Sequence, residues 1–77
     1  MFLATAYLLL IVETGTEEEV MRSLKSIEEV KEARIVYGLY DIIIRVETET
    51  MEEMKNLVNG RIRRLDKIRS TMTLIVV

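Results

Sequence analysis

The chain has 77 residues, of which 49% are apolar and 31% charged, a formal net charge of -2, and neither Cys nor His. A chain this short forms one domain, and its composition excludes a disordered segment, a disulfide framework and catalysis by a Cys-His or Ser-His pair. Because so small a core stabilises a domain only weakly, we expect a partner subunit to cover the surplus apolar surface.

The amino-terminal part predicts a strand followed by a helix. Residues 3–13 alternate between two faces that are both largely apolar, which is typical of a strand covered on both sides. Thr16 precedes three consecutive glutamates, a pattern that predicts a capping box with acidic residues at the positive end of a helix dipole. We therefore expect a helix over residues 16–27. The apolar residues 1–12 lack a basic flank and are too few to span a bilayer, so we expect a cytoplasmic protein.

The middle and the end of the chain predict three more strands. Residues 30–37 and 40–48 alternate apolar and polar side chains on either side of the Gly38-Leu39 break, which predicts a β-hairpin. Residues 68–77 alternate in the same way and predict the closing strand.

A second helix separates the hairpin from the last strand. Thr50 and Glu53 predict another capping box, and apolar residues at three- and four-residue steps extend the helix to Leu65. Gly60 interrupts this pattern, so either a close packing contact requires it or the helix loosens there. A basic cluster follows: Arg61, Arg63 and Arg64. The negative end of the helix dipole is a sufficient structural reason for it, and a phosphate site is the alternative.

The element order βαββαβ predicts the α+β class and the ferredoxin-like arrangement, a four-stranded antiparallel sheet with two helices on one face. The first strand is central in this topology and apolar on both sides. The face without helices must therefore meet something, and a second copy of the same sheet is the simplest partner, giving a dimeric α+β barrel.

Several functions found in this fold require residues that this sequence does not contain. The few acidic runs are explained by helix capping, so we expect no metal ion and no other cofactor. The three glycines lie more than twenty residues apart and cannot form a phosphate loop. The negative net charge and the presence of only four aromatic residues do not predict direct binding to nucleic acid, and the charge does not predict binding to a membrane surface.

Two motifs nevertheless resemble a known family. Gly38, Tyr40 and Asp41 match a glycine-x-tyrosine-aspartate turn, and Thr71 and Thr73 match a closing threonine-x-threonine strand. Together, in this element order, they resemble the effector-binding (regulation of amino acid metabolism, RAM) domain of the leucine-responsive regulator/AsnC (Lrp/AsnC) family over the whole chain. The usual arginine of the second motif is Ser70 here, and Asp66-Lys67 replaces a glycine common before the last strand. The helix-turn-helix domain of full-length members has no counterpart in residues 1–77, so the resemblance implies a stand-alone domain without a DNA-binding domain.

The resemblance implies dimers through facing sheets, association into rings that are commonly octameric, and amino acid sites between dimers. The site residues we expect from it and from the local chemistry are Gly38, Leu39, Tyr40, Asp41, Ser70, Thr71 and Thr73. The Asp41 carboxylate can accept hydrogen bonds from an ammonium group, and the two threonines can serve a carboxylate. The alternatives are that Gly38 supplies a positive φ, that Asp41 bonds its own turn and that the threonines only favour a strand.

We therefore expect a non-enzymatic, oligomeric amino acid sensor that acts in transcriptional regulation, with itself and full-length Lrp/AsnC-type regulators as partners. A cofactor-independent monooxygenase-like enzyme with a dimeric α+β barrel is one alternative, and it requires a deep pocket between sheet and helices. A purely structural oligomerisation module is the other. It is favoured if protein side chains fill the space around the expected site.

Overall fold

The computed structural model describes residues 3–77, so Met1 and Phe2 of the apolar amino-terminal stretch lie outside the described residues. The elements are β1 (Ala4–Val12), α1 (Glu17–Lys25), β2 (Val30–Ile35), β3 (Ile42–Thr48), α2 (Met51–Leu57), the π-helical turn η1 (Val58–Ile62) and β4 (Ile68–Ile75). In the described part of the chain, no helix is long and apolar enough to cross a membrane.

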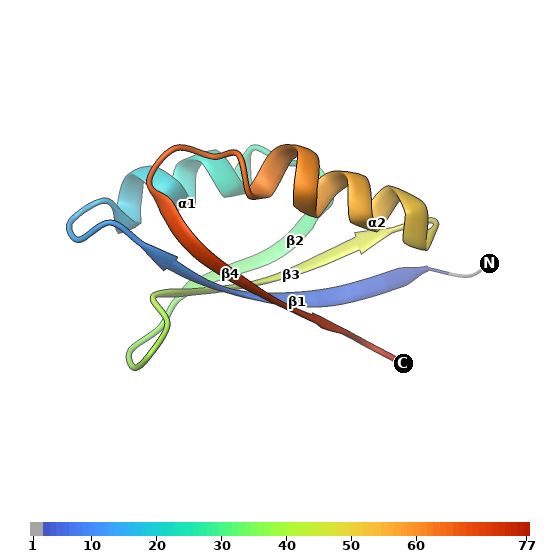
Figure 1. Cartoon of the computed structure of the whole chain (residues 1–77), viewed down its shortest axis with the longest axis horizontal. Coiled ribbons are helices and arrows are strands. Elements are labelled where there is room, and N and C mark those ends of the chain that lie inside the picture. The colour runs from blue at the N-terminus through green and yellow to red at the C-terminus, as the bar shows by residue number, and fades with distance from the viewer. Residues whose placement is uncertain (1–2) are drawn as a thin grey trace.

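The four strands form one antiparallel sheet in the order β2-β3-β1-β4, with β1 in the interior beside β3 and β4. Both helices cover the same face of this sheet, and the opposite face carries none (Figure 1). The predicted ferredoxin-like fold is therefore confirmed.

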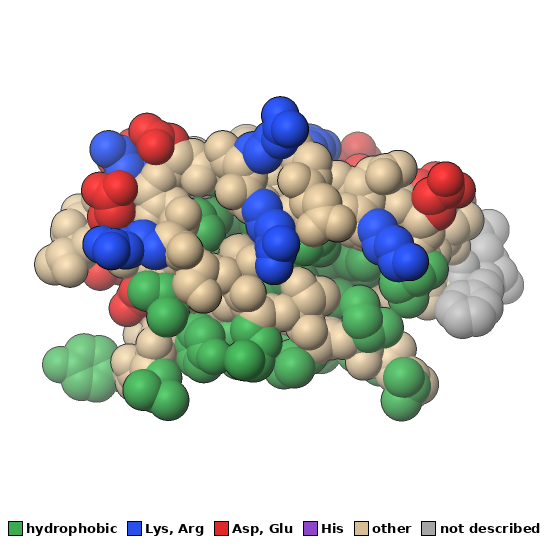
Figure 2. Space-filling model, viewed as in Figure 1, with side chains coloured by type: hydrophobic (Ala, Val, Ile, Leu, Met, Phe, Trp, Pro, Cys, Tyr) green, Lys and Arg blue, Asp and Glu red, His purple; other side chains and the backbone are tan. Residues whose placement is uncertain are grey.

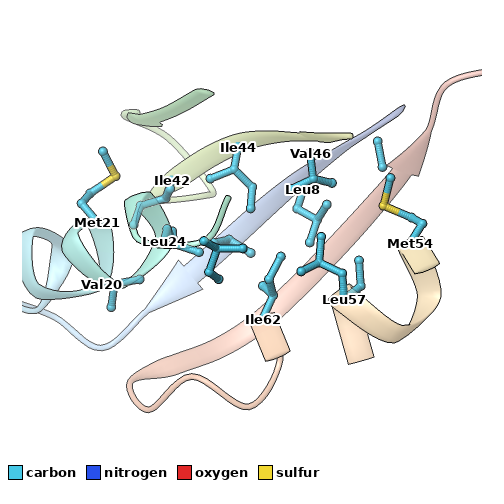
Figure 3. Packing of buried hydrophobic residues seen from close by; sticks show 14 of the residues in the cluster. Leu8, Val20, Met21, Leu24, Ile42, Ile44, Val46, Met54, Leu57 and Ile62 are labelled. Atoms are coloured by element: carbon cyan, nitrogen blue, oxygen red, sulfur yellow. The ribbon is translucent and has the colours of Figure 1, made fainter. Parts of the chain in front are cut away.

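The core lies between the sheet and the helices. Alternate residues of β1 and β3 point into it, and Leu8 and Ile44, which lie opposite each other in the register, are fully buried. Leu24, Leu57 and Ile62 close the core from the helix side (Figure 3). The contacts are almost entirely aliphatic, so the hydrophobic effect is the main force that fixes the helices on this face.

The two predicted helix caps differ in outcome. At α2 the Thr50 hydroxyl accepts a hydrogen bond from the Glu53 backbone N–H (3.1 Å), which confirms the predicted cap. Glu53 Oε1 in turn accepts from the Glu49 N–H at 3.2 Å, one residue before the cap. At α1 the predicted side-chain cap is wrong, because the Thr16 hydroxyl donates instead to the Glu13 carbonyl oxygen (2.7 Å). There the three glutamates of the first turn still lie at the positive end of the dipole.

The second helix does not run regularly to Leu65. After Leu57 it widens into η1, and the Arg63 N–H donates to the Val58 carbonyl oxygen at 2.9 Å, five residues back. A Cβ built at Gly60 would have no atom within 4 Å. Of the two explanations that the sequence left open for Gly60, the structure supports a loosened helix and not a close packing contact.

The face without helices, called here the helix-free face, has two halves. Its apolar half consists of Tyr7, Leu9, Ile11, Ile43, Met72 and Leu74, which the strand register places side by side. Its charged half consists of Glu32, Arg34, Arg45 and Glu47, linked by ion pairs of 2.6 to 3.7 Å. In Figure 2 hydrophobic side chains gather on the sheet side of the molecule and charged ones over the helices. About half of the surface of Met72 (45%) and Leu74 (48%) remains exposed, which leaves this half available to a partner.

Candidate functional site

The β2–β3 connection carries the first group of expected site residues. β2 ends at Ile35, earlier than predicted, and β3 begins at Ile42, later than predicted; the loop between them projects from the sheet away from the helices (Figure 1). Gly38 has a φ of +146°, so a side chain there would be strained. Leu39 is 88% exposed and points its apolar side chain into solvent. An exposed aliphatic residue at a projecting turn is available for contact with another molecule.

Asp41 ties this loop to the central strand. Its Oδ2 accepts a hydrogen bond from the Val12 N–H at 2.9 Å, and its own N–H donates to the Leu10 carbonyl oxygen at 2.8 Å. Its carbonyl oxygen also accepts from the Val36 N–H at 2.9 Å. The carboxylate therefore bonds β1 rather than its own turn. Oδ2 of Asp41 therefore has a structural role. A ligand would have to compete with the Val12 N–H for this oxygen or bind the other carboxylate oxygen.

Tyr40 and Ser70 lie on the helix-free face. The Tyr40 hydroxyl contacts the Met72 sulfur at 3.6 Å, a contact that joins the β2–β3 loop to β4. Ser70 lies opposite Ile11 in the register, two residues before Met72, and so shares this face. The structure therefore brings the loop and the start of β4 to the same side of the sheet.

Thr71 and Thr73 lie on the opposite face, which the helices cover. They are paired with the buried residues Leu10 and Leu8 of β1. The Thr71 hydroxyl accepts a hydrogen bond from Arg63 Nε at 2.9 Å. Ser70 and Thr71 both line one hollow of about 330 Å³ beside β4, together with Arg63, Ile68 and Arg69. This hollow is called the β4 hollow below.

The sequence did not single out Arg63 and Arg69 as site residues. Arg63 belongs to the basic cluster attributed to the helix dipole. That explanation fits Arg61, which lies in the last turn of η1 and also forms an ion pair with Glu29 at 3.6 Å. Arg63 instead reaches β4. The Gly60 interruption of the helical pattern was the signal that could have separated the two arginines, because a widened turn changes the direction of the residues after it.

The element order, the sheet order and the two helices on one face define a ferredoxin-like α+β domain. Comparison with known proteins narrows the class. The chain belongs to the Lrp/AsnC ligand binding domain family, whose sequence model matches residues 5–77. The predicted resemblance is thereby confirmed.

Relatives and solved structures agree with this assignment. The regulatory protein AsnC of Haemophilus influenzae is 40% identical over 58 residues, which cover 75% of this chain and 39% of AsnC. The crystal structure of FFRP-DM1 has a TM-score of 0.94 and 40% identity, covering 96% of this chain and 99% of that one. A hypothetical protein from Pyrococcus horikoshii has a TM-score of 0.92 and 40% identity, covering 96% and 89%. The chain thus spans about two fifths of the curated relative and nearly all of the two structural neighbours.

Proposed function

We propose that this domain is a cytoplasmic, non-enzymatic sensor of an amino acid or similar small molecule, and that it acts in transcriptional regulation through its own assembly or with full-length Lrp/AsnC-type regulators. The observation that carries the proposal is membership of a ligand-binding domain family whose curated relatives are regulators. Two solved structures with this fold, from Neisseria meningitidis and M. tuberculosis, are complexes with L-methionine; at 13% and 21% identity they are related to this chain by fold alone.

The apolar half of the helix-free face supports self-assembly. A C2 dimer would place this half against its own copy, because the same surface serves both subunits of such an interface. Leu9 lies at its centre, flanked by Ile43 on β3 and Met72 on β4. Further association of dimers into a ring, commonly an octamer in this family, would bring the exposed β2–β3 loops of neighbouring subunits within reach of a ligand.

The mechanism we propose is a population shift. The ligand would favour one assembly or conformation by its differential affinity, and it could redirect a regulator only to that extent. Strand β4 connects the two surfaces, since Met72 and Leu74 lie on the helix-free face and Thr71 lines the β4 hollow. A ligand that orders β4 would therefore act on the dimer contact as well.

Calorimetry and thermal shift with each of the twenty amino acids test the sensor proposal. Asp41→Ala is a poor probe because Asp41 holds the end of β1. Ser70→Ala removes one hydroxyl from the expected site, and Ser26→Ala, an exposed hydroxyl at the end of α1 that bonds only the Ser23 carbonyl oxygen, is the matched control. We expect one or a few amino acids to bind, more weakly in Ser70→Ala and unchanged in Ser26→Ala. Absence of binding by all twenty would contradict the proposal and favour a structural oligomerisation module.

The oxygenase alternative finds no support in residues 3–77. It requires a deep pocket between sheet and helices, and that space is filled by the side chains of Leu8, Ile44 and Leu57 (Figure 3). The curated relatives are regulatory proteins.

A further inference from the structure

The β4 hollow has a one-sided charge. Its lining consists of two arginines, Arg63 and Arg69, two hydroxyl residues, Ser70 and Thr71, and the aliphatic Ile68, and none of these five carries a carboxylate. The volume of about 330 Å³ is at the lower end of the range of small-molecule sites. A hollow with two positive charges and two hydroxyl donors attracts an anion.

Arg63 is held in place for such a ligand. Its Nε donates to Thr71 Oγ1 at 2.9 Å, which fixes the plane of the guanidinium group. The two terminal nitrogens form the fork that matches the two oxygens of a carboxylate. No ion pair of Arg63 or Arg69 occurs among residues 3–77, whereas Arg61 is paired with Glu29 and Arg45 with Glu47. The charge of Arg63 is therefore not neutralised by a partner within the described chain.

Both arginines follow an irregularity of the backbone. Arg63 comes directly after the π-helical turn η1, and its N–H closes the bond to Val58. Arg69 is the extra residue of a β-bulge, because Ile11 pairs with Ser70 and Val12 with Ile68. Turns and bulges of these kinds are frequent at functional sites, where they redirect a side chain. Each of these two independent irregularities thus places one arginine at the same hollow.

We propose that the β4 hollow binds the carboxylate of a ligand with net negative charge, a small dicarboxylate such as an acidic amino acid or its 2-oxo acid, with Arg63 as the principal contact and Arg69 as the second. This rests on the proposed sensor function and names the ligand class. The choice between charge classes follows from the lining, because a neutral amino acid brings one carboxylate to two arginines, whereas a dicarboxylate brings a second carboxylate that the second arginine attracts.

Matched ligands test this proposal by calorimetry on the intact chain. L-glutamate is compared with L-glutamine and L-aspartate with L-asparagine, pairs that differ in charge and hardly in shape. Succinate and inorganic phosphate serve as anions without an amino group. We expect the dicarboxylates to bind at least about 10-fold more tightly than the amide isosteres, and to weaken as ionic strength rises, because the arginines are exposed to solvent.

Variants locate the site. Arg63→Gln is expected to weaken binding of the dicarboxylates at least about 10-fold, and Arg69→Gln less strongly. Arg64→Gln is the control, because Arg64 is an exposed neighbour that does not line the hollow. Thr71→Val keeps both charges but removes the acceptor that orients Arg63, so it should also weaken binding. Far-UV circular dichroism establishes that each variant is folded.

The outcomes separate this inference from the sensor function. If the amide and acid isosteres bind equally, or if Arg63→Gln leaves binding unchanged, the inference is wrong. Binding of any amino acid would still support the sensor proposal. Succinate binding that is lost in Arg63→Gln, with no amino acid bound, would support the anion site and contradict the amino acid sensor. Phosphate binding more tightly than every dicarboxylate would overturn the assignment to carboxylates.

Discussion

Gly60 offers a direct test of how the second helix is built. The glycine lies within η1, outside the left-handed region, and a Cβ at this position would meet open space. Gly60→Ala therefore removes the entropic cost of a glycine in a helix without adding a clash, and we expect it to raise the free energy of unfolding by about 1 kcal/mol. For a domain of this size that corresponds to a rise in melting temperature of roughly 4 to 8 °C.

The measurement is thermal unfolding followed by far-UV circular dichroism, with variant and parent at the same protein concentration because assembly also shifts the transition. Gly15→Ala is the matched control. A Cβ there also has no atom within 4 Å, but the φ of Gly15 is +86°. We expect this variant to be destabilised by about 1 kcal/mol. A fall in melting temperature for Gly60→Ala would show that a packing contact, and not a loosened helix, requires this glycine.

Three further predictions concern single side chains. Lys67 has a φ of +79°, so Lys67→Gly should raise the free energy of unfolding by about 0.5 to 1 kcal/mol in urea titrations while Lys67→Ala gives no gain. Asp41→Ala leaves the Val12 N–H without its acceptor and should cost about 1 to 3 kcal/mol in the same titration, whereas Asp41→Asn, which keeps an acceptor oxygen, should cost less. Leu9→Glu places a charge at the centre of the apolar half, so light scattering should show the dissociation constant of the proposed dimer rising at least about 100-fold. Lys55→Glu on α2 is the control and should leave the association state unchanged.

The fold was predictable because its signals are local. The alternation in β1, the break at Gly38 and the apolar steps of the helices each depend on neighbouring residues, and together they allow few topologies. The ends of the hairpin strands were not predictable in this way. β3 begins directly after Asp41, whose carboxylate accepts a hydrogen bond from the Val12 N–H, 29 residues away in the sequence, and so distant a contact gives no local signal.

The composition of the site was less predictable, for a geometric reason. The sequence placed Ser70, Thr71 and Thr73 in one motif, yet in a strand successive side chains point to opposite faces, and the pairing with β1 shows Ser70 on the helix-free face and Thr71 toward the helices. Both residues line the hollow at the edge strand, where the bulge at Arg69 interrupts the regular pleat.

The direction of the Arg63 side chain could not be predicted from the sequence either. A regular α-helix advances about 100° per residue, so one residue added by a π-turn rotates every later side chain by about that angle. An uninterrupted helix would turn Arg63 away from the direction in which it meets Thr71, and its charge would then serve only the helix dipole. Whether an arginine of this cluster contacts β4 thus depends on where the helix widens. A single glycine in the sequence marks that place but does not fix the number of residues in the turn.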